Sequence, residues 1–300
     1  MFKENPSLIQ GPIADPRAGL ETVGITSTDS PTPLVLIHDG GGTTFGYYCL
    51  GDLYRPVYGI ANPHYGTDER WEGGIHEMAS YYLKLIKTVI PPGSKVIIGG
   101  WSLGGLLSLE VSRLVLAEAG RRGALDLLGI IMIDSVCPLS LLSAGDVRVV
   151  LHVVEWNENT RQETRDAVMR CFSEAYRMLG AWKLPTWRDD GGQNGAGNGH
   201  NGTSPTTPST TAGSLPPPPP PTILLRAQER VPVAEPGGVA RVDVCRNDRQ
   251  LGWDQHHRDL IKQVHDIPGH HYNIFSTDEN LDAVTDMIKK ACFELEAMRG

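Results

Sequence analysis

The 300-residue chain lacks any long hydrophobic run and any apolar leader segment. A transmembrane helix needs about 20 consecutive apolar residues, and no segment approaches that length. The first 20 residues instead contain prolines at positions 6, 12 and 16, which interrupt any helix there. We therefore expect a soluble, cytoplasmic protein that does not use a membrane as a partner.

Cysteine is scarce, and the basic residues are scattered. The five cysteines are widely spaced and include no Cys-x-x-Cys pair, so the sequence predicts neither a disulfide framework nor a zinc site. Lysine and arginine form no block in a chain of net charge −8, which argues against nucleic acid as a partner. We expect the protein to work without a metal ion or a bound cofactor.

What the chain does contain is a Gly-x-Ser-x-Gly motif between an apolar strand and a helix. Three β-branched residues at 96–98 precede Gly-Trp-Ser-Leu-Gly at 100–104, and apolar residues then recur at helical spacing over 103–115. This pattern predicts a nucleophile elbow, a sharp strand-to-helix turn with Ser102 at its apex. The flanking glycines leave room for the strained bend, and the helix N-terminus favours negative charge beside the hydroxyl. The alternative is a glycine-rich turn without chemistry.

Apolar runs alternate with helical segments along most of the chain. Buried strands are expected at 33–38, 57–62, 127–133 and 222–227 beside the elbow strand, a short strand and turn at 266–272, and helices at 44–52, 75–89, 103–115 and 281–295. Strands that alternate with helices form a parallel, doubly wound sheet that binds ligands at the carboxyl ends of its strands. Together with the elbow, this rhythm predicts an α/β-hydrolase fold with a helical lid insertion.

The organisation of the chain follows from where this rhythm is interrupted. Residues 1–32 are rich in Pro, Gly, Ser and Thr and are expected to form an extended lead-in, followed by one hydrolase domain over 33–300. Within that domain, 138–188 carry an amphipathic helical stripe and are expected to form a lid over the site. Residues 189–221 are of low complexity and end in six prolines, which predicts a disordered loop.

A serine, an aspartate and a histidine are expected to converge beside the elbow. A serine hydroxyl needs a base, and the usual base is a histidine that a carboxylate holds in the right tautomer. The chain supplies Ser102, Asp134 and His271 in the order found in α/β-hydrolases. Asp134 directly follows the strand after the elbow strand, and His271 lies in a glycine-led loop near the C-terminus. We predict that these three residues are catalytic.

Alternatives remain for the acid and for the base. Glu229 follows the later strand at 222–227, where many α/β-hydrolases carry their carboxylate, and competes with Asp134. His270 is adjacent to the favoured histidine, and only one of the two can face the site. A further histidine, His38, lies in the glycine-rich loop, where a structural hydrogen bond is favoured over base chemistry.

A glycine-rich loop, His-Asp-Gly-Gly-Gly at 38–42, follows the first strand of the domain. In hydrolases of this topology, the loop after this strand donates one N–H group to the oxyanion hole, and the residue after the nucleophile donates the other. We expect the backbone N–H groups of Gly40 and Leu103 to fill these roles. The alternative is a turn that only starts the helix at 44–52.

Four motifs carry a likeness to a known family: His-Asp-Gly-Gly-Gly at 38–42, Tyr-Gly-Ile-x-Asn-Pro at 58–63, Trp-Glu-Gly-Gly-Ile at 71–75 and Gly-Gly-Trp-Ser-Leu-Gly-Gly at 99–105. They resemble the thioesterase domains of polyketide and non-ribosomal peptide synthases, above all a fungal group of such enzymes. The resemblance implies Asp134 as the acid and the histidine of Gly-x-His, His271, as the base. It covers the first half of the chain well and the second half in part, and the insertion at 189–221 departs from it.

The resemblance also implies a function. A free-standing serine thioesterase of secondary metabolism would take an acyl or polyketide chain from the phosphopantetheine thioester of an acyl carrier protein or synthase in trans. It would release the finished chain to water or to an internal hydroxyl or amine, or clear misloaded acyl groups. A carboxylesterase or lipase with the same residues is the alternative of the same class, and a non-catalytic scaffold that docks through its Pro-rich loop is the alternative of another class.

Overall fold

The computed structural model describes residues 5–11, 31–141, 148–150, 156, 158–188 and 216–299. Most of the lead-in predicted for 1–32 lies outside these residues, as does the part of the loop predicted for 189–221 that precedes residue 216. The lid predicted for 138–188 is described in part.

A seven-stranded sheet forms the centre of the molecule, in the order β1-β3-β2-β4-β5-β7-β9. Its strands are β1 (Ser7–Gln10), β2 (Leu34–Ile37), β3 (Val57–Ile60), β4 (Lys95–Trp101), β5 (Asp126–Ile133), β7 (Thr222–Ala227) and β9 (Ile261–Ile267). β1 is antiparallel to β3, and the other neighbouring pairs are parallel. The mostly parallel, doubly wound sheet predicted from the sequence is confirmed.

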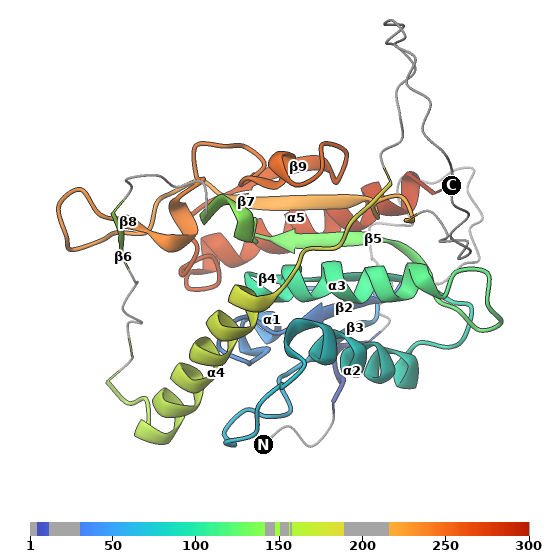
Figure 1. Ribbon diagram of the computed structural model, residues 1–300, viewed down its shortest axis with the longest axis horizontal. Helices are drawn as coiled ribbons and strands as arrows, with labels where there is room; N and C mark the ends of the chain where they lie inside the picture. Colours follow the sequence, from blue (N-terminus) through green and yellow to red (C-terminus); the bar gives the residue numbers. More distant parts are fainter. Residues whose placement is uncertain are drawn as a thin grey trace, which may run out of the picture.

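Helices cover both faces of the sheet (Figure 1). They are α2 (Gly74–Val89) and α3 (Leu103–Ala117) on one face, and α1 (Phe45–Tyr48) and α5 (Asp278–Ala297) on the other. Along β2, Val35 and Ile37 belong to the core beneath α2 and α3. Leu34 and Leu36 belong to the core beneath α5. Because the inner strands are buried on both faces, their sequences are unbroken apolar runs.

Two segments, within 138–188 and 228–260, belong to the connections from β5 to β7 and from β7 to β9. Each covers the carboxyl ends of the strands before the chain returns to the amino end of the next strand, and we call their described residues the roof. The first contains η1 (Pro138–Leu141), β6 (Val149–Val150) and α4 (Gln162–Ala181), and the second contains β8 (Val239–Ala240), η2 (Arg241–Asp243) and η3 (Trp253–Gln255). β6 pairs with β8 in parallel and joins the two segments. Figure 1 shows α4 and this small sheet on the left, beyond the ends of the central strands.

Two predicted elements differ from the structure at their ends. The helix expected at 44–52 is a single turn, α1, after which the N–H of Gly51 donates to Thr285 Oγ1 at 3.1 Å instead of continuing the helix. The last strand, expected from Asp266, begins at Ile261. This strand is at the edge of the sheet and is partly exposed, so it shows no apolar run. Ser7–Gln10, within the lead-in, form the opposite edge strand.

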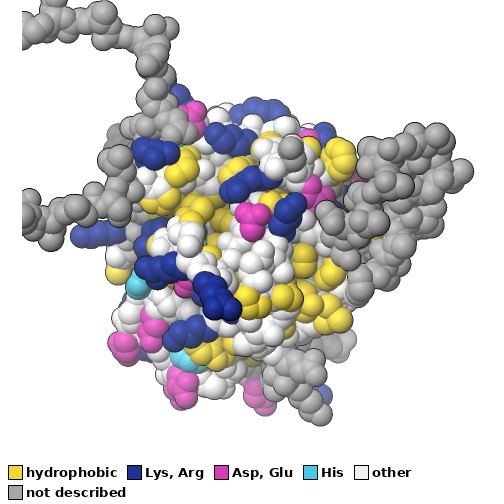
Figure 2. Space-filling view, turned by 90° about the vertical axis from the view of Figure 1, so that its right-hand side faces the viewer, with side chains coloured by type: hydrophobic (Ala, Val, Ile, Leu, Met, Phe, Trp, Pro, Cys, Tyr) yellow, Lys and Arg dark blue, Asp and Glu magenta, His cyan; other side chains and the backbone are white. Residues whose placement is uncertain are grey.

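Figure 2 shows the end of the molecule remote from α4, toward the amino ends of the central strands. Charged side chains of both signs lie among hydrophobic ones on this face. Within the described ranges, the helices are too short or too polar to cross a membrane.

Candidate active site

Ser102 lies at the turn between β4 and α3, with φ 56° and ψ −115°. Its N–H donates to the carbonyl of Ile133 on the neighbouring strand at 2.9 Å, which anchors the turn to the sheet. A Cβ at Gly100 would lie 2.6 Å from the Ile37 carbonyl oxygen, and a Cβ at Gly104 would collide with the same oxygen. The two glycines are therefore required because the turn packs directly against the backbone of β2. The strained elbow predicted from the motif is present.

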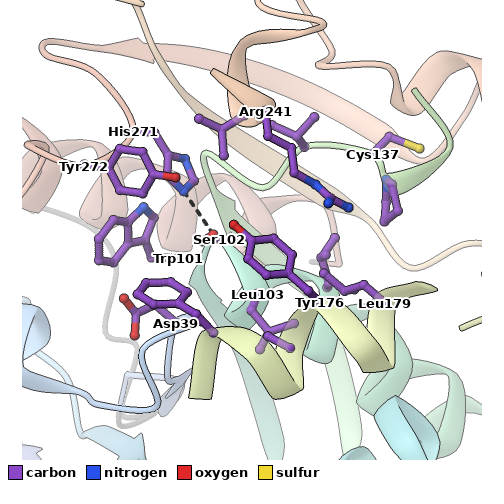
Figure 3. A pocket seen from close by; sticks show the side chains of 17 residues that line it. Asp39, Trp101, Ser102, Leu103, Cys137, Tyr176, Leu179, Arg241, His271 and Tyr272 are labelled. Atoms are coloured by element: carbon purple, nitrogen blue, oxygen red, sulfur yellow. Dashed lines mark hydrogen bonds between the residues drawn. The ribbon is translucent and has the colours of Figure 1, made fainter. Parts of the chain in front are cut away.

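The structure brings the serine, the histidine and the aspartate together. His271 Nε2 lies 3.0 Å from Ser102 Oγ, and His271 Nδ1 lies 2.8 Å from Asp134 Oδ2. The first of these contacts is the dashed line in Figure 3. Asp134 follows β5, which is paired in parallel with β4, so both residues leave the same edge of the sheet. This geometry allows His271 to accept the serine proton and to donate its other ring proton to the carboxylate.

The carboxylate of Asp134 is fully buried and has three further donors. Arg246 donates to it through two nitrogens, at 2.5 and 2.8 Å, and the N–H of Ala227 donates at 2.9 Å. Burial by itself raises the pKa of this carboxyl, but the hydrogen bonds and charges of His271 and Arg246 outweigh it and hold the pKa at about 2. Asp134 is therefore ionised at neutral pH.

Arg246 is itself buried and belongs to the roof. Its Nε donates to Asp243 Oδ1 at 2.8 Å, and it also donates to the carbonyls of Ala227 and Val242. The guanidinium thus links two carboxylates, one from the sheet edge and one from the roof. Sequence reasoning made no prediction for Arg246, because its segment has no motif and no apolar periodicity.

The loop after β2 places Gly40 beside the elbow. Asp39 Oδ1 accepts from the N–H of Gly41 at 3.0 Å, and the N–H of Gly42 donates to the Asp39 carbonyl at 3.1 Å, which closes a tight turn. Among the described residues, the backbone N–H groups of Gly40 and Leu103 have no acceptor, and both residues line the pocket that contains Ser102. Two such donors suit an oxyanion.

The alternative residues lie elsewhere. Glu229 is exposed, and its N–H donates to the carbonyl of Gly269. His270 lines a neighbouring pocket, and its Nδ1 accepts from the N–H of Tyr272 at 3.3 Å. His38 is buried, its Nε2 lies 2.6 Å from the Tyr82 hydroxyl, and burial lowers its pKa to about 4. The structure thus places neither His38 nor His270 at Ser102.

A mainly apolar pocket opens at the Ser102 hydroxyl (Figure 3). The elbow, α3 and the segment after β5 contribute Trp101, Leu106 and Val136, and the roof contributes Pro138, Phe172, Ala175, Tyr176, Leu179, Arg241 and Val242. The described residues of the roof therefore face the site, while the lid at 138–188 stays a prediction. The second roof segment, 228–260, was not foreseen as part of the site.

No group of three or more His, Cys, Asp or Glu side chains in the described part of the chain is arranged to hold a metal ion. An acidic and a basic side chain, Asp39 and Arg241, line the Ser102 pocket together with the Ser102 partner His271.

Comparison with known proteins assigns the chain to a family. Residues 32–189 match the model of the thioesterase domain. The thioesterase frbE of a Dothideomycetidae species is 36% identical over 267 residues, which cover 88% of this chain and 90% of that protein. The nonribosomal peptide synthetase imqB of Aspergillus flavus is 30% identical over 281 residues, which cover 93% of this chain and 8% of the synthetase.

A solved structure shares the fold. The NocB thioesterase domain, in covalent complex with a fluorophosphonate nocardicin G analog, superposes with a TM-score of 0.57 at 18% identity and covers 87% of this chain and 94% of its own. The family match spans more than half of the chain, and a relative above 30% identity is covered almost completely. The chain therefore belongs to the thioesterase family, whose members hydrolyse thioesters on an α/β-hydrolase fold.

Proposed function

We propose that the protein is a serine thioesterase that takes an acyl chain from the phosphopantetheine thioester of a carrier protein and carries it on Ser102. The observation that supports this most directly is the pair of contacts through His271, 3.0 Å to Ser102 Oγ and 2.8 Å to Asp134 Oδ2. They connect a hydroxyl at an apolar pocket to a buried, ionised carboxylate.

Acylation begins when Ser102 Oγ attacks the thioester carbonyl carbon and His271 Nε2 takes the hydroxyl proton. The carbonyl oxygen becomes an oxyanion, to which the N–H groups of Gly40 and Leu103 donate. The tetrahedral intermediate then collapses, the carbon–sulfur bond breaks, and His271 returns its proton to the departing pantetheine thiolate. Asp134 remains ionised and stabilises the imidazolium between these two transfers.

Deacylation repeats the sequence with another nucleophile. A water molecule, or a hydroxyl or amine of the acyl chain itself, gives a proton to His271 and attacks the acyl-enzyme carbonyl. Ser102 leaves with the proton from His271, and the product is a free acid, a lactone or a lactam. The apolar walls of the pocket suit the acyl chain and limit the access of bulk water.

The setting we propose is secondary metabolism, with the protein acting in trans on a polyketide or nonribosomal peptide synthase. The match of nearly the whole chain to a small part of a nonribosomal peptide synthetase supports this setting. In that setting the enzyme would release finished chains or remove misloaded acyl groups.

Intact-protein mass spectrometry tests the acyl-enzyme. Mixing the protein with octanoyl and other acyl carrier protein thioesters should add the mass of the acyl group, and peptide mapping should place it on Ser102. Ser102→Ala should give no adduct, whereas Ser80→Ala, which removes a half-buried hydroxyl on α2 that donates to the His76 carbonyl, should behave as the wild type. No adduct with any carrier thioester, or an adduct that persists in Ser102→Ala, would contradict the proposal.

The substrate class needs a second comparison. We expect kcat/KM for an acyl-pantetheine thioester to exceed that for the ethyl ester of the same acid. A higher value for the ester would instead identify a carboxylesterase, which uses the same residues. A protein that acylates with neither substrate would fit the scaffold alternative.

A further inference from the structure

Arg241 places a cation in the wall of the mainly apolar pocket at Ser102, which Asp39 also lines. It belongs to η2, directly after β8, and it lines the pocket together with Tyr176, Val242 and Tyr272. Figure 3 shows its side chain reaching down from the second roof segment toward Tyr176. Sequence analysis did not single out Arg241, because its segment carries no motif.

The guanidinium of Arg241 lies over an aromatic ring and has no acidic partner among the described residues. Its Cζ is 4.9 Å from the centre of the Tyr176 ring, a cation–π contact that fixes its position. Within the described part of the chain, no carboxylate forms an ion pair with it, although Asp243 lies two residues away. That carboxylate is engaged by Arg246 and by the N–H of Val231.

The positive charge of Arg241 also acts on Tyr272. Burial raises the pKa of Tyr272, and the positive charge of Arg241 acts in the opposite direction. Tyr272 is adjacent to His271 in the chain and lines the same pocket. The charge of Arg241 therefore acts within the region that an acyl chain on Ser102 would enter.

An arginine in such a wall has five N–H donors and no acceptor, so it binds best to a group with two acceptor oxygens. Partly desolvated by its apolar neighbours, it makes a stronger ionic hydrogen bond than it would in water. A purely hydrocarbon chain would cover these donors without satisfying them, at a cost in free energy.

We propose that Arg241 selects acyl chains that carry a carboxylate away from the thioester carbonyl. This inference rests on the proposed function and names the substrate class of the same site. The other anionic group of the substrate, the phosphate of the phosphopantetheine arm, is separated from the sulfur by the whole pantetheine chain. Because Arg241 lines the same pocket as Ser102, the carboxylate on the acyl chain is the group that it would meet.

Matched substrates test the selection. N-acetylcysteamine thioesters of dicarboxylic acids of six, eight and ten carbons, which carry no phosphate, are compared with the same thioesters whose far carboxyl is a methyl ester. The wild type should acylate faster with the free acid of the best length by about 10- to 100-fold in kcat/KM, a range typical of hydrogen bonds to a charged group. Arg241→Met should abolish this preference while it leaves the methyl esters reactive, and Arg241→Lys should keep part of it.

Controls separate selection from a general effect of charge or folding. Arg258→Met removes an exposed cation from the same roof segment and should keep the wild-type preference. An unchanged preference in Arg241→Met, or an equal loss for acids and esters, would overturn the inference. So would a loss in Arg241→Met that is confined to octanoyl-phosphopantetheine and spares octanoyl-pantetheine, because it would assign Arg241 to the phosphate.

Binding to the Ser102→Ala variant keeps the inference testable even if the protein forms no acyl-enzyme. Calorimetry should give a dissociation constant at least about 10-fold lower for the free acid than for the methyl ester. The double variant with Arg241→Met should bind both alike. Equal binding of the two by Ser102→Ala alone would overturn the selection, whereas failure of acylation with this binding difference intact would count only against the proposed function.

Discussion

The floor and the roof of the pocket are built in different ways. The floor consists of the strand ends and turns at 38–42, 100–104 and 134–135, where backbone packs on backbone and glycines allow the approach. The roof comes from two segments that are not strands of the central sheet. They contact the floor through side chains such as Arg246 and Phe172. The strands therefore position Ser102 and Asp134, and we expect the roof to determine which substrate is accepted.

The largest effect on acylation is expected when a substitution adds a methyl group to the floor. In Gly104→Ala, the new Cβ would meet the carbonyl oxygens of Ile37 and His38, which belong to backbone and cannot move aside. Overpacking of this kind costs about 3 kcal/mol, and the elbow would shift away from His271. We expect acyl-enzyme formation to fall below detection in the mass-spectrometric assay, together with a lower melting temperature.

The matched change in the roof is Gly180→Ala. Gly180 is exposed on α4, and a Cβ there would have no heavy atom within 4 Å. Because alanine favours helix over glycine, this variant should be stabilised by up to about 1 kcal/mol and should acylate normally. Similar losses of activity in the two variants would remove the distinction between a rigid floor and a tolerant roof.

A smaller effect on acylation, about 10- to 100-fold, is expected where the roof contacts the floor through Arg246. Arg246→Met leaves the buried carboxylates of Asp134 and Asp243 without their cation, and a broken buried ion pair typically costs about 3–5 kcal/mol. Loss of the positive charge also favours the protonated form of the His271–Asp134 pair. In a plot of kcat/KM against pH, the acid limb should therefore move to higher pH.

The pH profile distinguishes this role from plain stabilisation. Arg55 is also a buried arginine, paired with Glu296 at 2.8 Å, at a place remote from Ser102. Arg55→Met should lower the melting temperature without moving the pH profile, and Arg246→Lys should move it less than Arg246→Met. If the pH dependence of kcat/KM were the same in Arg246→Met as in the wild type, Arg246 would only support the fold.

The floor could be predicted from the sequence because its geometry follows from local rules. A buried apolar strand, two glycines and a serine are enough to define the elbow, and the strand before Asp134 places that carboxylate at the same sheet edge. The structure places these groups within hydrogen-bonding distance of His271, although their catalytic roles remain a prediction.

The roof could not be predicted in the same way. Arg246 and Arg241 lie in a segment of short 3-10 turns with no apolar periodicity, and their partners are distant in the chain, such as Asp134 and Tyr176. Contacts of this kind depend on tertiary packing and leave no local pattern. The polar edge strand Ile261–Ile267 escaped full prediction because only its two end residues are buried, so it has no run or alternation of apolar residues.

A moderate effect on kcat/KM, about 10-fold, is expected when an apolar side chain of the roof is truncated. Phe172 lies over the glycine-rich loop at 38–42, where its Cε1 would be 2.9 Å from a Cβ at Gly40, and it lines the Ser102 pocket. Phe172→Ala should lower kcat/KM for octanoyl-N-acetylcysteamine by this factor, because the octanoyl chain is long enough to contact Phe172. The value of kcat/KM for acetyl-N-acetylcysteamine should stay nearly unchanged, because the acetyl group is too short for this contact. Phe293→Ala, on the exposed face of α5, should change neither value. Equal losses for both chain lengths would mean that Phe172 supports the loop at 38–42 and does not contact the acyl chain.

The smallest effect is expected from a charge on the floor that the chemistry does not use. Burial raises the pKa of Asp39 to about 6, although backbone N–H groups of Gly41 and Thr43 lower it. Since the pKa of a carboxyl in the unfolded chain is near 3.8, the native state binds the proton more tightly. Ionisation of Asp39 therefore costs native stability as the pH rises from about 4 to about 6, and that cost is complete above this range.

Asp39→Asn keeps the oxygen that accepts from Gly41 and removes the charge. The variant should match the wild type in melting temperature at pH 4 and exceed it by about 2 °C at pH 8, which corresponds to about 1 kcal/mol for a partly exposed group. Asp52→Asn, at an exposed position, should show no such dependence. A gain in melting temperature of the same size at both pH values would mean that asparagine only packs better there. A gain confined to high pH would show that the ionised carboxylate of Asp39 destabilises the folded protein, which tolerates it because the backbone turn at 39–42 holds it in place.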